Sequence, residues 1–159
     1  MRALILTIGL TILASACSYS HIGTTSATFI RPAPAIGTDT APPPAGPLVL
    51  QIRRHLDTVI RGPDTEEDQL LVLTVRDFGL NQRLAVPSAN VTPEFTATRF
   101  GPTSTGDSFL GYLIVKTVAT NQVTAYVHVD VTAHTESGSY TQRAKFRGEY
   151  KFFRETDND

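Results

Sequence analysis

The sequence predicts an α+β domain in which one amphipathic helix packs on an antiparallel β-sheet. Apolar residues recur at helical spacing over residues 48–60, and residues 108–154 contain three long strand patterns separated by short turns, the second of which alternates apolar and polar residues with a period of two. The 159 residues give room for one folded domain, which we place at residues 47–159. An all-β sandwich is the alternative, because short apolar runs fit buried strands as well as a helix.

Residues 1–16 have the features of an export signal. Arg2 supplies a positive charge, and residues 3–13 are almost entirely apolar. This stretch is too short to cross a bilayer core as a helix, which needs about 20 residues. We therefore predict a signal peptide that is removed from the mature protein.

The segment Ala14-Ser15-Ala16-Cys17 resembles the lipobox of bacterial lipoproteins, although that family prefers Leu where Ala14 stands. The resemblance implies cleavage before Cys17 and attachment of diacylglycerol and acyl chains such as palmitate to this residue. Ser18, rather than Asp, follows the cysteine, which in this family implies an outer-membrane location with the domain in the periplasm. The alternative is an ordinary secretory signal cut at the same bond, which would leave Cys17, the only cysteine, as a free thiol.

Residues 17–46 are interpreted as the lipidated cysteine followed by a flexible Pro-rich tether. Prolines remove backbone donors and favour extended geometry, and five of them stand at positions 32, 34, 42, 43 and 44. Only residues 27–30 have the composition of a short strand. The tether would reach roughly 90–100 Å. Residues 42–44 could alternatively be a ligand for an SH3-like groove.

The helix is predicted over residues 47–61. Pro47 suits the first helical position, and Gly62-Pro63 is a strong stop signal. The apolar positions that would share one helical face are Leu48, Val49, Ile52, Leu56, Val59 and Ile60. A pair of short strands is the competing interpretation. Beyond an acidic loop at residues 64–68, we expect a buried strand at 69–78 and short strands at 84–86 and 94–98.

The C-terminal sheet gives the most detailed expectation. Apolar residues from Val123 to Ala133 alternate with polar ones, as in a strand with one buried face. If Ser137 and Gly138 form a two-residue hairpin loop, Val131 lies opposite Ala144. This register keeps the apolar residues of both strands on one face, and a shift by one residue would move them into water.

The same register places basic residues on the solvent face, with His128 opposite Arg147 and Asp130 opposite Lys145. The candidate binding residues of the last strand are Arg143, Lys145, Arg147 and Lys151, and Arg154 lies at the end of the same basic stripe. Outward charges keep strand edges soluble, so this stripe can be explained without a function. The competing hypothesis is that it recognises an anionic glycolipid or an acidic partner protein. A net charge of −1 gives no indication of nucleic-acid binding.

The sequence gives little indication of catalysis. His128, Asp130 and His134 share one strand face, but the two histidines would lie roughly 20 Å apart at about 3.3 Å per residue, too far to share one metal ion. No nucleophile motif is present, and we expect no enzyme activity, metal or cofactor. The predicted function is a non-catalytic outer-membrane lipoprotein that assists envelope assembly by binding a protein or an anionic glycolipid. The alternatives are a periplasmic hydrolase or metal-dependent enzyme, and a subunit of a secretion or conjugation apparatus.

Overall fold

The computed structural model describes residues 19–30, 46–59, 65–99, 103–135, 138 and 141–155. This part of the chain forms strands and connecting turns and contains no helix. A helix that could span a bilayer is therefore absent from the described residues. The strands are β1 (Tyr19–Ile30), β2 (Leu48–Val59), β3 (Thr65–Val75), β4 (Arg83–Val86), β5 (Val91–Arg99), β6 (Thr103–Val118), β7 (Gln122–Thr135) and β8 (Thr141–Arg154).

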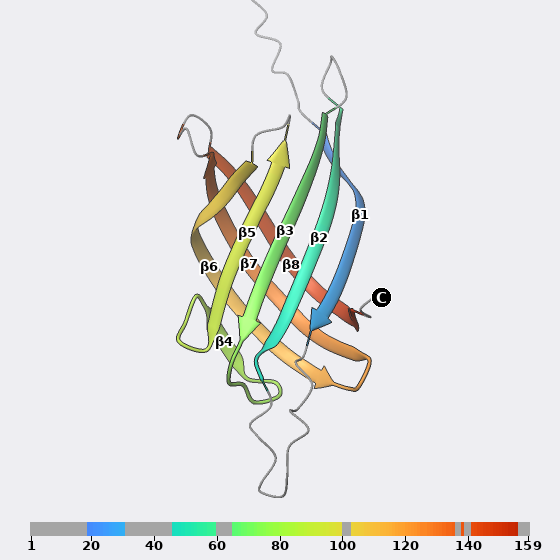
Figure 1. Ribbon diagram of the computed structural model, residues 1–159, viewed down its shortest axis with the longest axis vertical. Coiled ribbons are helices and arrows are strands. Elements are labelled where there is room, and N and C mark those ends of the chain that lie inside the picture. Colours follow the sequence, from blue (N-terminus) through green and yellow to red (C-terminus); the bar gives the residue numbers. More distant parts are fainter. Residues whose placement is uncertain are drawn as a thin grey trace, which may run out of the picture.

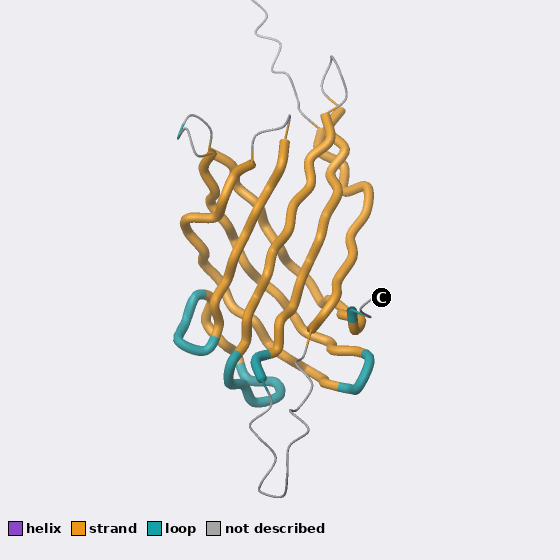
Figure 2. The backbone as a smooth tube through the Cα atoms, in the orientation of Figure 1, coloured by secondary structure: helices purple, strands orange, loops and turns teal. Residues whose placement is uncertain are grey.

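The strands form a single sheet that closes on itself. Their order is β4-β6-β5-β3-β2-β1-β8-β7, and β7 pairs in turn with β6. Neighbouring strands are antiparallel except for β1 and β8, which are parallel. In Figure 1, β1, β2, β3 and β5 lie in front of β6, β7 and β8 and cross them at an angle. Figure 2 shows how completely strands make up the described chain.

The core fills the space that the closed sheet encloses. Alternate residues of each strand point inward, as the pattern of buried and partly exposed positions along β7 shows. The largest fully buried side chains are Phe29, Phe146, Phe152, Leu48, Leu50, Ile52, Leu71, Leu73, Leu113, Val75, Val86 and Val91. Because they come from both the front and the back strands, their burial holds the two layers together.

The predicted helix at residues 47–61 is wrong, because this segment is strand β2. Leu48, Leu50 and Ile52 are buried while Arg53 is exposed, which is the period of a strand. Positions four residues apart, such as Leu48 and Ile52, lie on one face of a helix and also on one face of a strand. The apolar spacing therefore does not distinguish the two structures. Because β1 and β3 both pair with this segment as antiparallel neighbours, it forms a strand rather than a helix. The α+β prediction is therefore corrected to all-β, in one closed sheet.

The predicted tether also needs correction, since residues 19–30 form β1. This strand pairs with β2 along its length, from Tyr19 opposite Val59 to Ile30 opposite Val49. Threonine, phenylalanine and isoleucine favour a pleated, half-buried surface, and Phe29 is buried in the core. Residues 1–18, with the signal peptide and Cys17, and residues 31–45, with the prolines, lie outside the described residues.

The middle of the chain follows the sequence more closely. The strands expected at 69–78, 84–86 and 94–98 correspond to β3, β4 and β5, with shifted ends. The acidic segment 64–68, expected to be a loop, is mostly the start of β3, and its Glu67 is buried. Glu67 accepts hydrogen bonds from the side-chain amides of Gln69, at 2.6 Å, and Gln142. These amides satisfy a carboxylate that the sequence alone would place in solvent.

The register expected for the C-terminal hairpin is confirmed. Val131 pairs with Ala144, Asp130 with Lys145 and His128 with Arg147. Gly138 has a φ of 66°, while its expected partner in the turn, Ser137, lies outside the described residues. The apolar face of β7 is buried in full.

Candidate functional site

The outward side of β6, β7 and β8 carries the residues that the sequence singles out. Arg143, Lys145, Arg147 and Lys151 occupy alternate positions of β8 and are all exposed. His128 lies beside them on β7, where it pairs with Arg147 across the two strands. We call this surface of β6, β7 and β8 the basic face.

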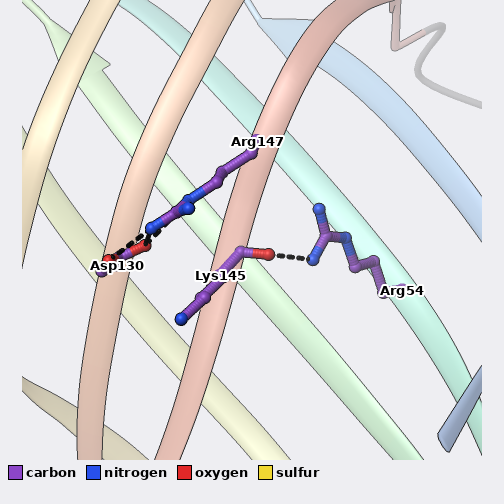
Figure 3. A network of polar contacts seen from close by, with 4 residues as sticks. All are labelled: Arg54, Asp130, Lys145 and Arg147. Carbon is purple, nitrogen blue, oxygen red and sulfur yellow. Dashed lines mark hydrogen bonds and ion pairs between the residues drawn. The ribbon is translucent and has the colours of Figure 1, made fainter.

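One of the four cations is paired within the molecule. The Arg147 guanidinium donates to both carboxylate oxygens of Asp130, with Nη2 2.8 Å from Oδ2 and 3.0 Å from Oδ1 (Figure 3). Lys145 is the direct cross-strand neighbour of Asp130, but the arginine takes the carboxylate from the diagonal position because it can bind both oxygens. Both side chains are about half exposed, so the pair adds about 1 kcal/mol or less to stability.

A second ion pair lies farther along the basic face. The Lys116 ammonium donates to Glu149 at 2.5 Å. This hydrogen bond, with the Lys116 charge and the nearby Lys151 charge, lowers the pKa of Glu149 below its ordinary value. Glu149 is thereby engaged by Lys116 rather than by Lys151.

Three cations of the basic face are left without an ion pair in the described part of the chain. They are Arg143, Lys145 and Lys151. Asp130, the cross-strand neighbour of Lys145, and Glu149, two residues before Lys151 on β8, already bind Arg147 and Lys116. These three side chains are therefore available to an external anion.

A row of stacked rings crosses the same surface next to the cations. The ring of Tyr112, on β6, stacks on His128 with centroids 5.1 Å apart and on Tyr126 with centroids 6.0 Å apart. The Arg83 guanidinium, on β4, lies 3.8 Å from the centroid of Tyr112. These contacts restrict the rings, so their polar ends are presented with little conformational freedom left to lose.

Sequence reasoning found His128 and the cations but missed Tyr112 and Arg83. A register shift in the β6–β7 pairing, between Val115 and Thr117, brings Tyr112 opposite His128. Without that extra residue, Tyr112 would face the core. The burial of β6 changes parity accordingly, since Val118 packs on the core at an even position and Val115 and Leu113 at odd ones. The continuous apolar run at residues 112–115 has no alternation from which the sequence alone could show this change.

The residues considered for a metal or a catalytic site have separate contacts. Asp130 binds Arg147, His134 binds the carboxylate of Asp107, and His128 stacks on Tyr112. Asp107 is itself the extra residue of a second register shift, between Gly106 and Ser108. Among the residues described, no three His, Cys, Asp or Glu side chains are grouped so that they could hold a metal ion.

An open pocket lies on the opposite side of the molecule and is lined by residues of β1, β2, β3 and β5. It has a volume of about 460 Å³. Within it, His55 Nδ1 lies 2.8 Å from Asp68 Oδ1. Its lining mixes hydroxyls, one apolar side chain and charges of both signs, and none of the predicted binding residues belongs to it.

No protein-family model, curated protein or solved structure matches the chain.

Proposed function

We propose that the chain is a non-catalytic outer-membrane lipoprotein that is anchored through Cys17 and binds an anionic glycolipid on its basic face. The observation that carries the proposal is the meeting, on one exposed surface, of three cations without an ion pair and a row of stacked rings. Phosphate groups of a glycolipid would be bound by the charges of Arg143 and Lys145. Sugar hydroxyls would form hydrogen bonds with the polar ends of Tyr112 and Tyr126.

The position of β1 supports a ligand within the membrane rather than one far from it. β1 begins at Tyr19, two residues after Cys17, so a lipid on that cysteine would hold this end of the sheet within about 7 Å of chain. Because β1 and β8 are parallel, β8 begins at the same end of the sheet. Arg143 and Lys145 lie near that beginning, where an anchored molecule would meet lipid head groups.

Binding of purified lipopolysaccharide to the full chain tests the recognition step. Replacing Arg143 and Lys145 with serine should weaken binding at least tenfold, and enzymatic removal of the lipopolysaccharide phosphates should weaken it by a similar factor. Replacing Arg53 and Arg76 with serine is the matched control, since it removes the same charge from exposed positions outside the basic face, on β2 and just after β3. Equal binding by both double variants would refute recognition by the basic face.

Mass spectrometry of the protein recovered from membranes tests the anchor. We expect the mature chain to begin at an acylated Cys17 and Cys17→Ser to leave the membrane fraction. An unmodified Cys17 would refute the anchor while leaving lipopolysaccharide binding to be judged separately.

A further inference from the structure

The ring of strands closes least completely between β1 and β8. Within the described part of the chain, these strands pair only at Thr28 with Phe153 and at Phe29 with Arg154. One more hydrogen bond joins them there, from the Glu155 N–H to the Phe29 carbonyl at 3.0 Å. From this junction the two strands diverge toward their N-terminal ends (Figure 1). We call the gap between them the β1–β8 seam.

Both strands direct backbone groups into the seam. In an extended strand, the N–H and C=O of every second residue point to the same side. Phe29 bonds across the junction through its carbonyl, so Ala27 and Thr25, two and four residues earlier, also face the seam. On β8 the same alternation from Glu155 sets the backbone of Lys151, Glu149, Arg147 and Lys145 toward the seam. An edge of this kind is a template for an added strand.

A cavity lies next to the junction, where β1 and β8 begin to diverge. This cavity of about 490 Å³ lies between the two strands, lined by Thr25, Ser26, Ala27, Thr28, Glu149, Tyr150, Lys151 and Phe153. Gly148 has a φ of 144°, a backbone conformation that only glycine adopts readily. A Cβ on Gly148 would have no atom within 4 Å, so the inward side of β8 is also open at this point.

A side chain of β2, Arg54, supplies a hydrogen bond to the backbone of β8 that a neighbouring strand would otherwise supply. The Arg54 guanidinium, on β2, reaches across to β8 and donates to the Lys145 carbonyl at 2.7 Å (Figure 3) and to the Tyr150 hydroxyl. It lies 4.0 Å from the centroid of the Phe146 ring. Its Nε is buried without a hydrogen-bond partner, and no carboxylate of the described residues pairs with it. The donor that a strand would supply at Lys145 thus comes from Arg54.

We propose that the β1–β8 seam binds an extended acidic segment of a partner protein, which runs antiparallel to both strands. Because β1 and β8 are parallel, a single inserted strand can be antiparallel to each of them. Such a strand needs about 10 Å between its neighbours, and the short junction and the contacts of Arg54 with β8 oppose that opening. This site lies beyond the proposed glycolipid function and does not rest on it, since its affinity comes from backbone groups of the seam, although both ligands would use the charge of Lys145.

Charge determines the class of segment that fits. Side chains of the inserted strand that point outward would lie next to Lys145 and Lys151 of β8, which have no ion pair in the part of the chain that the structure describes. On the other side, Thr24, Ser26 and Thr28 of β1 offer hydroxyls and no charge. Side chains of the inserted strand that point inward would lie next to Ala27 of β1 and Tyr150 of β8. The segment should therefore carry carboxylates at outward positions, up to about 20 Å apart, alternating with small apolar residues.

Selection of displayed random dodecapeptides on the purified full chain tests this proposal. We expect enriched peptides to carry acidic residues at alternate positions and no proline in the central part. On binding, the amides of Ala27 and Arg147 should become protected from hydrogen exchange. Failure to enrich any such peptide would overturn the proposal.

Two pairs of variants connect the binding to the seam. Ala27→Pro removes a seam-facing N–H, which an edge strand tolerates, and should weaken binding at least tenfold, while Ala27→Ser keeps the N–H and should bind like the parent. Lys151→Glu should weaken binding of the acidic peptides at least tenfold, and Arg76→Glu should not. The charge pair decides the matter if Ala27→Pro does not fold. Unchanged binding in both Ala27→Pro and Lys151→Glu would refute the site.

Sedimentation of the chain alone tests the other occupant of a free edge. A concentration-dependent dimer that Ala27→Pro abolishes would assign the seam to a second copy and overturn the proposal. A monomer that binds the selected peptides supports the partner segment.

Discussion

The β6–β7–β8 surface and the β1–β8 seam are made in opposite ways. The first consists of consecutive antiparallel strands joined by short turns, with pairing along nearly their whole length. The second brings together strands from opposite ends of the chain, in parallel, at two residue pairs. Local pairing fixes register through turn geometry and side-chain alternation. Closure of the ring, by contrast, depends on the packing of the complete core and on one arginine.

The largest expected effect lies in the locally paired region. A Cβ at Gly111 would stand 1.8 Å from the carbonyl oxygen of His128 and 2.9 Å from Cα of Val129, so the backbones of β6 and β7 must separate to accept it. Gly111→Ala should lower the free energy of unfolding by about 3 kcal/mol. Urea denaturation measures the change.

Gly79→Ala is the control for Gly111→Ala. Its Cβ would have only the flexible Gln82 side chain within 4 Å, and we expect a change several times smaller. Equal effects of the two substitutions would mean that the close approach of β6 and β7 is wrong.

In the seam, we expect a smaller loss from replacing Arg54. Arg54→Met keeps an apolar chain over Phe146 but removes the donors to the Lys145 carbonyl and the Tyr150 hydroxyl. The free energy of unfolding should fall by about 1–2 kcal/mol, and amides of β1 should exchange faster than those of β7. Arg53→Met, at the neighbouring exposed position, should change neither quantity. Uniform exchange across β1 and β7 would contradict a specific role for Arg54 in closing the seam.

The same contrast explains how much the sequence could predict. The hairpin of β7 and β8 was predicted to the residue, because alternation from Val123 to Ala133 and the turn at Gly138 specify it locally. The sequence of β2 also predicts a helix because Leu48 and Ile52 fit both periods, and only the pairing of β1 and β3 on its two sides decides between them. The sequence alone suggests a tether in place of β1 because its main partner, β2, has the apolar spacing of a helix and its other partner, β8, lies at the far end of the chain.

The candidate site divides in the same way. The positions of Arg143, Lys145, Arg147 and Lys151 on one face follow from alternation within a single strand. The stack of Tyr112 on His128 requires the extra residue in β6, and the seam requires strands at opposite ends of the sequence. Neither feature follows from the pattern of any one strand.

Loss of the ring stack should have a modest effect on stability and a larger one on recognition. Tyr112→Ser removes contacts with His128, Tyr126 and Arg83, and should cost about 1 kcal/mol of stability. On the proposed function, it should also weaken lipopolysaccharide binding, measured by titration, about tenfold. Phe153→Ser, which removes an exposed ring from the outward side of β8, is the control. Equal loss of binding in both variants would remove the ring stack from the site.

The smallest expected effect is electrostatic and local to the basic face. The hydrogen bond and charge of Lys116 are the main causes of the lowered pKa of Glu149, and Lys151 contributes less. Lys116→Met should therefore raise the pKa of Glu149 toward its ordinary value, and Lys151→Met should raise it less, as measured by NMR titration of the carboxyl carbon.

A lowered pKa means that the folded state holds the proton of Glu149 less tightly than the unfolded chain does. The Lys116–Glu149 contribution is therefore present at neutral pH and is lost as the pH falls through the folded-state pKa. If the order of the two variants were reversed, Glu149 would be paired with its neighbour on β8 rather than with β6, and Lys151 would not be available to a ligand.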